Sequence, residues 1–164
     1  MSEPITDEIL HQIADKRELT HRVTNGRLSF AIPFTGASPN QLYVNAGSES
    51  DGRVFSVRTY VEATYPVEVE QTLLHLANEF QREHRWPKVV VNRRGEQCSI
   101  HGEFYLPVET GTTPEQLDEV IAAVVTSSIY FWDWLPDRLI EAADVRFADD
   151  DWASIEHLLS PETE

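Results

Sequence analysis

The sequence predicts an α+β fold in which helices cover an antiparallel sheet, and two observations support this class. The segments that read as strands alternate apolar and polar side chains, a pattern typical of antiparallel strands with one covered face. The elements follow the order helix, three strands, helix, two strands, helix, and such segregated runs favour α+β over a doubly wound parallel sheet. The 164 residues fit one domain, which we expect over residues 1–140, followed by an acidic tail over residues 141–164.

The first helix is expected over residues 5–14, where isoleucine and leucine recur at helical spacing. Thr6 or Asp7 can accept hydrogen bonds from the free amides of its first turn. Three alternating segments then predict strands, each ended by turn residues such as glycine, proline and asparagine. These strands are expected at residues 27–34, 42–46 and 54–61.

Beyond Pro66 the apolar period changes from two residues to about 3.6, which predicts the central helix. Pro87 prevents this helix from continuing and biases Trp86 toward extended geometry. The core stripe of the helix consists of Val69, Leu73, Leu76 and Phe80.

The segment "KVVVNRRGEQ" reads as strand, turn and strand, because Asn92 and Gly95 bracket a reversal. In the outgoing strand, apolar and polar side chains occupy opposite faces. The polar face carries Ser99, His101 and Glu103. Cys98 falls on the apolar face, where a thiol is usually an inert core residue.

The last helix begins in "TTPEQLDEVI", where Thr113 can be the N-cap, Pro114 occupies the first position and Gln116 completes a capping box. Pro136 is expected to end this helix or to kink it. The core stripe consists of Leu117, Ile121, Val124, Ser128, Trp132 and Leu135.

An aromatic run, "YFWDW", begins at Tyr130 of the last helix. Helical spacing places Phe131 and Trp132 on or beside the core stripe, whereas Tyr130 and Trp134 project away from it. A monomer with a single covered sheet would leave Tyr130 and Trp134 partly exposed. We therefore expect a protein interface at these two residues, packed against either the tail helix around Trp152 or another subunit.

The tail, residues 141–164, holds eight acidic residues and one basic residue. Within it, Trp152, Ile155 and Leu159 are spaced for a short amphipathic helix. A separate basic cluster runs over the end of the central helix and the hairpin. We expect its members to be surface charges paired with acidic residues, and the alternative is a site for an anionic partner such as the acidic tail. The cluster consists of Arg82, Arg85, Lys88, Arg93 and Arg94.

Charge and cysteine content restrict the classes of function. The chain has 28 acidic and 13 basic residues, a net charge of −15, which repels nucleic-acid phosphates and anionic lipid surfaces. Cys98 is the only cysteine, so no intrachain disulfide and no cysteine-based zinc site can form. The start "MSEPITDEIL" lacks the features of a signal peptide, and no stretch reaches the roughly 18 apolar residues of a membrane span. We expect a cytoplasmic protein without a nucleic-acid or membrane partner.

No arrangement of side chains in the sequence predicts a reaction centre. His75 and Glu79 are one helical turn apart, but the zincin pattern needs two histidines four residues apart with a glutamate between them. Ser99, His101 and Glu103 share a strand face, but no nucleophile-elbow glycine pattern accompanies them. We therefore expect no catalytic residue, no cofactor and no metal ion.

Three segments resemble, in order and spacing, the YbjN-domain family, which shares the fold of type III secretion chaperones. They are "LLHLANEFQREHRWPKVVVN", "GEFYLPVETGTTPEQLDEVI" and "FWDWL", and the match covers residues 67–135 well. The most specific parts are Arg-Trp-Pro-Lys at 85–88 and Phe-Trp at 131–132. Members of this family commonly carry an acidic hairpin turn, whereas this chain has "NRRG" there.

The resemblance implies a helix, sheet, helix, sheet, helix unit that is often dimeric, has no known catalytic machinery and is described as sensory or regulatory. Chaperones of similar fold bind extended segments of partner proteins. We therefore expect a non-enzymatic regulatory or adaptor protein that holds a partner segment or self-associates. The alternative is a small-molecule-binding or enzymatic domain with a pocket between the sheet and the last helix, and Ser99, His101 and Glu103 are its candidate residues if they face inward.

Overall fold

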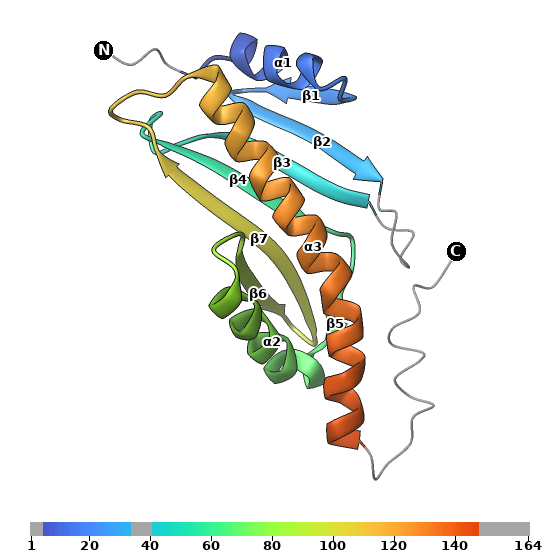
Figure 1. The fold of residues 1–164 in the computed structure, drawn as a ribbon. Helices are drawn as coiled ribbons and strands as arrows, with labels where there is room; N and C mark the ends of the chain where they lie inside the picture. Colours follow the sequence, from blue (N-terminus) through green and yellow to red (C-terminus); the bar gives the residue numbers. More distant parts are fainter. Residues whose placement is uncertain (1–4, 34–40, 148–164) are drawn as a thin grey trace.

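The chain forms two layers, an antiparallel sheet and a layer of helices on one of its faces (Figure 1). The computed structural model describes residues 5–33 and 41–147. The helices are α1 (Asp7–Lys16), α2 (Glu70–Glu83) and α3 (Pro114–Phe147), with a 3-10 turn η1 (Val67–Val69) before α2. The strands are β1 (His21–Thr24), β2 (Arg27–Pro33), β3 (Gln41–Glu49), β4 (Val54–Tyr60), β5 (Tyr65–Pro66), β6 (Lys88–Arg94) and β7 (Gln97–Pro107). The predicted α+β class, with helices covering an antiparallel sheet, is confirmed.

Within the described residues the strands form one seven-stranded sheet of order β1-β2-β3-β4-β7-β5, and β6 also pairs with β7. Every pair is antiparallel. The 11 residues of β7 make it long enough to pair with β4 over residues 101–107 and with β6 over residues 97–103. The strand β7 therefore connects the two parts of the sheet.

The helix α3 runs obliquely across the sheet, with α1 beside its first turns and α2 beside its later half (Figure 1). In β2 and β3 the alternating pattern buries one side of the strand under these helices. The largest fully buried side chains come from all three helices and from the sheet. They are Phe55, Phe80, Phe131, Leu10, Leu28, Leu42, Leu73, Leu117, Ile121, Leu135, Val44 and Val57.

Side chains cap α1 and α3 as the sequence predicts. The Thr6 hydroxyl accepts a hydrogen bond from the Ile9 N–H at 3.3 Å. At the start of α3, the Gln116 N–H donates to Thr113 Oγ1 at 3.2 Å, and the Thr113 N–H donates to Gln116 Oε1 at 2.9 Å. This reciprocal pair is a capping box, which satisfies two amides that the helix leaves free.

The sequence pattern predicts neither β1 nor β5. The strand β1 pairs with β2 through a turn in which Asn25 and Gly26 have φ angles of 52° and 72°, as a two-residue hairpin turn requires. Its four residues contain one large apolar side chain, Val23, and β5 has two residues, so neither is long enough to show a period. Phe34, the predicted end of β2, lies outside the described residues.

Pro136 does not end α3, which continues to Phe147. Leu135 and Leu139, on either side of the proline, are both buried, and we attribute the continuity to this packing, which offsets the loss of one helical hydrogen bond. The expected boundary at residue 140 falls inside this helix. The predicted tail helix lies outside the described residues, and the division into a domain and a separate tail stays a prediction.

Candidate functional site

A row of aromatic side chains lies where α3 passes α2. Tyr130, Trp134 and Arg138 follow one another at intervals of four residues, so they occupy one side of α3. Phe80 and His84 have the same spacing at the end of α2. We call these five residues the aromatic strip.

The rings of the strip contact one another from helix to helix. The Phe80 ring centroid lies 5.5 Å from that of Trp134 and 6.2 Å from that of Tyr130. The His84 ring stacks on Phe80 at 4.2 Å and lies 5.2 Å from Tyr130. The guanidinium carbon of Arg138 lies 5.8 Å from the centre of the Trp134 ring, within cation–π range. Each ring therefore has neighbours that hold its orientation.

The strip leads from the core to solvent. Phe80 is 1% exposed, Trp134 is partly buried and Tyr130 is 52% exposed. Tyrosine, tryptophan and arginine are the residue types that contribute most often to the binding energy of protein interfaces. The strip therefore has the composition of a protein-binding surface.

The predicted core residues of the aromatic run, Phe131 and Trp132, are both buried. Tyr130 projects away from the core as predicted, but Trp134 also packs against Phe80 of α2. This contact was not predicted, because the period of a helix does not reveal which other helix it meets. Trp152, the third predicted interface residue, lies outside the described residues, so its role stays a prediction.

Ser99, His101 and Glu103 face away from the helices, on the open side of the sheet. The His101 Nε2 atom lies 2.7 Å from Glu103 Oε1, and the Asn92 side-chain nitrogen lies 2.9 Å from His101 Nδ1. Both ring nitrogens are thus engaged, and within the described chain no hydrogen bond joins Ser99 to His101. The three residues do not assemble a nucleophile with its base, and they do not face a pocket beneath α3.

Glu103 belongs to an ionic network on this open face. Arg58 lies directly across from it in β4, with nitrogen–oxygen distances of 3.8 Å to Glu103 and 3.6 Å to Glu49. Lys88 lies 3.8 Å from Glu103. Partial burial raises the pKa of Glu103, but the hydrogen bond from His101 and the nearby positive charges outweigh it and lower the pKa below its ordinary value. The charged side chains Arg58, Lys88, Glu49 and Glu103 of this face are therefore paired with one another.

The predicted basic cluster is spread over several elements, because Arg82 lies in α2, Arg85 lies between α2 and β6, and Lys88, Arg93 and Arg94 lie in β6. Lys88 and Arg94 are the two ends of this strand, which places them about 20 Å apart at roughly 3.3 Å per residue. Lys88 pairs with Glu103, and Arg93 pairs with Glu70 at 3.4 Å. These two pairs agree with the expectation of paired surface charges.

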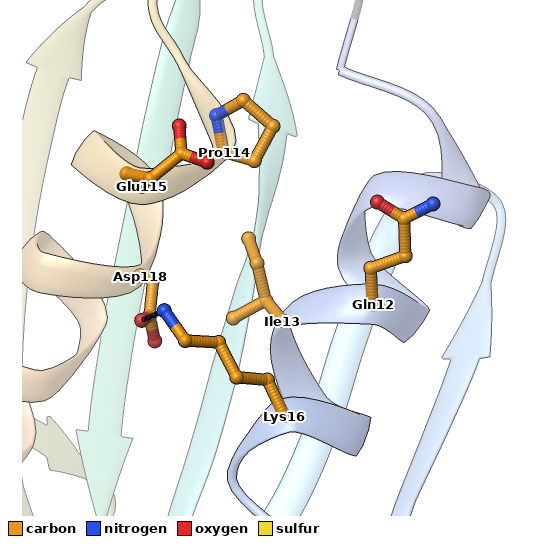
Figure 2. Close-up of a pocket in the computed structure, with 6 residues that line it drawn as sticks. All are labelled: Gln12, Ile13, Lys16, Pro114, Glu115 and Asp118. Atoms are coloured by element: carbon orange, nitrogen blue, oxygen red, sulfur yellow. Dashed lines mark hydrogen bonds and ion pairs between the residues drawn. The ribbon is translucent and has the colours of Figure 1, made fainter.

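A small hollow of about 110 Å³ lies between α1 and the start of α3 (Figure 2). Beside it, Lys16 Nζ lies 3.0 Å from Asp118 Oδ2, and Arg17 also pairs with Asp118. Ligand pockets usually measure about 300–1,000 Å³, so this hollow is too small for an ordinary metabolite. Its residues instead join the first and last helices. The lining consists of Gln12, Ile13, Lys16, Pro114, Glu115 and Asp118.

Two histidines that no sequence motif joins, His11 and His21, meet between α1 and β1. The His11 Nδ1 and His21 Nε2 atoms lie 2.9 Å apart, and His21 Nδ1 lies 2.8 Å from the Leu19 carbonyl oxygen. Their separation in sequence hid this pair. In the part of the chain that the structure describes, no group of three or more His, Cys, Asp or Glu side chains is arranged to hold a metal ion.

The fold defines a two-layer α+β protein with an aromatic strip on its helical layer. A family model described as "Putative bacterial sensory transduction regulator" matches residues 6–136, and the chain belongs to this family, YbjN. No curated protein matches the chain significantly. Over residues 5–33 and 41–147, no helix is long and apolar enough to cross a membrane.

Among solved structures, the chain is similar to the crystal structure of YbjN from E. coli, which is described as a putative transcription regulator. The TM-score is 0.56 at 14% sequence identity, and the match covers 85% of this chain and 92% of that chain. At this identity the likeness establishes the shared fold. The predicted family and fold are therefore confirmed.

Proposed function

We propose that this chain is a non-enzymatic regulatory domain that acts by protein–protein contact, with the aromatic strip as its contact surface. The observation that carries the proposal is that Tyr130 is 52% exposed although its ring contacts those of Phe80 and His84. A side chain that is already ordered adds contact area with little further loss of conformational entropy. Tyr130 and Trp134 are thus the residues on which we expect binding to depend most.

The family description supports a regulatory role, since it names a sensory transduction regulator. The alternative, a small-molecule or enzymatic domain, has less support in the geometry. Its candidate residues His101 and Glu103 face the open side of the sheet, and the hollow beside Asp118 is small.

Site-specific photo-cross-linking in cells of the source organism tests this proposal. The photoreactive residue p-benzoylphenylalanine is placed at Tyr130 in the full chain. The matched control is the same residue at Tyr105, which is 39% exposed on the open sheet face. We expect cross-linked protein, either a partner or a second copy of the chain, from position 130 and little from position 105.

The proposal is wrong if irradiation gives no protein cross-link at position 130, or if positions 130 and 105 give the same products in the same yield. Circular dichroism of both purified variants establishes that the substitutions leave the fold intact.

A further inference from the structure

The exposed side of α3 around the strip is acidic. Asp133, Asp137 and Glu141 are exposed, and they stand three or four residues from Tyr130, from Trp134 or from one another. Residues at this spacing share one side of a helix. The two aromatic rings are therefore bordered by carboxylates along about three helical turns.

The neighbouring helix adds further negative charge. Glu79 of α2 lies 3.7 Å from Arg138, and Glu141 lies 3.0 Å from Arg138. Glu83, next to His84 at the end of α2, is exposed. Arg138 thus engages Glu79 and Glu141, while Asp133, Asp137 and Glu83 take part in no ion pair within the described residues.

Arg138 illustrates what this surface can bind. Its guanidinium lies over the Trp134 ring while it pairs with carboxylates on both helices. A cation held between an aromatic face and carboxylates gains both cation–π and ionic attraction. The Tyr130 ring, together with Asp133 and Asp137, offers the same combination to a cation from outside.

We infer that the aromatic strip binds a basic amphipathic helix of a partner protein. Its apolar side packs on Tyr130 and Trp134, and its lysine or arginine side chains face Asp133, Asp137 and Glu83. This inference rests on the proposed function and specifies the chemistry of the partner.

Charge disfavours the other occupants of this surface, the tail and a second copy of the chain. Residues 148–164, the end of the tail, contain six acidic residues and no lysine or arginine, so they would place like charges against Asp133, Asp137 and Glu83. A second copy packed through the same surface would bring these carboxylates against their own counterparts. Like-charge contacts at an interface disfavour the wrong partner, which leaves a basic segment of another protein.

Fluorescence anisotropy with designed peptides tests the inference on the full chain. The probe is a labelled helical peptide with leucine on one side and lysine on the other. A second peptide has the same composition in scrambled order, and a third has glutamate in place of lysine. We expect the patterned basic peptide to bind at least about tenfold more tightly than the other two. Raising the salt concentration from 0.1 M to 1 M shortens the Debye length from about 10 Å to about 3 Å and should weaken this binding.

Variants locate the binding site. Tyr130→Ala and Asp133→Lys should each lower the affinity for the patterned peptide by about tenfold, since each removes a central contact. The matched control is Glu119→Lys, an equal change of charge at an exposed position of the same helix. It lies roughly 20 Å from Asp133 along the axis, at about 1.5 Å per residue, and should leave affinity nearly unchanged. Circular dichroism checks the fold of each variant.

The inference is overturned if the scrambled and patterned peptides bind with equal affinity. It is also overturned if Glu119→Lys weakens binding as much as Asp133→Lys. General attraction to a chain of charge −15 would explain either result. If position 130 cross-links to a protein but the patterned peptide does not bind, the inference fails and the proposed function stands. If both experiments are negative, both ideas fail.

Discussion

The hydroxyl oxygens of Thr59 in β4 and Ser128 in α3 lie 2.7 Å apart, and both residues are 0% exposed. This hydrogen bond joins the sheet to the middle of the helix that carries the aromatic strip. Since neither hydroxyl can reach water, each depends on the other for its hydrogen bond.

Ser128→Ala should lower the free energy of unfolding by about 1–3 kcal/mol, because it leaves the Thr59 hydroxyl buried without a partner. The double change Thr59→Val with Ser128→Ala removes both hydroxyls and should cost less than the sum of the single changes. Urea unfolding of the wild type, Ser128→Ala, Thr59→Val and the double variant measures this double-mutant cycle. Strict additivity would show that the two hydroxyls do not interact.

Gly102→Ala should destabilise the sheet beneath α3. A Cβ atom at this position would lie 2.6 Å from Thr59 Oγ1 and 2.8 Å from Pro87 Cγ, so its neighbours would have to move. Overpacking of this kind costs about 1–3 kcal/mol. Ser99→Ala, on the open face of the same strand, should change stability by less than about 0.5 kcal/mol. Thermal unfolding compares the two, and equal melting temperatures would contradict the prediction.

Asp118 should make stability depend on pH in the acid range. Burial raises the pKa of its carboxyl, but the hydrogen bonds and charges of Arg17 and Lys16 outweigh it, and the pKa is lowered. A carboxyl whose pKa is lower in the folded state stabilises the fold above the unfolded pKa of about 3.9. That contribution is lost as the pH falls through the lower, folded value.

Asp118→Asn should therefore destabilise the protein at pH 7 and lose less stability than the wild type on acidification. The measurement is urea unfolding from pH 7 to pH 2. Asp133→Asn, which changes an exposed carboxylate without an ion pair in the described chain, serves as the control. Parallel curves for the wild type and Asp118→Asn would argue against this role.

Tyr130 and Phe131 are adjacent in sequence but should differ in their effect on stability. Phe131 is 1% exposed and contacts Phe80, whereas Tyr130 is 52% exposed. Phe131→Ala should cost about 3–5 kcal/mol through the cavity that it leaves. Tyr130→Ala should cost roughly 1 kcal/mol or less. Denaturant unfolding gives both values, and similar losses would mean that Tyr130 has a structural role.

The sequence determined those features that depend on near neighbours in the chain. The capping box of Thr113 and Gln116 formed as predicted, since its bonds span one helical turn. The alternation in β2 and the stripe containing Leu117 and Ile121 identified the buried sides, because the periods of strands and helices are fixed by backbone geometry. The same helical period predicted that Phe131 is buried and that Tyr130 is exposed, and it pointed to two of the five strip residues, Tyr130 and Trp134.

Only the tertiary structure decided which distant residues meet. Phe80 and Trp134 form one surface because α2 and α3 pack side by side, and Thr59 reaches Ser128 across the two layers. Pro136 lies within a continuous helix whose flanking leucines are buried. These outcomes depend on long-range packing, whose free energy exceeds the local preferences that a sequence pattern reports.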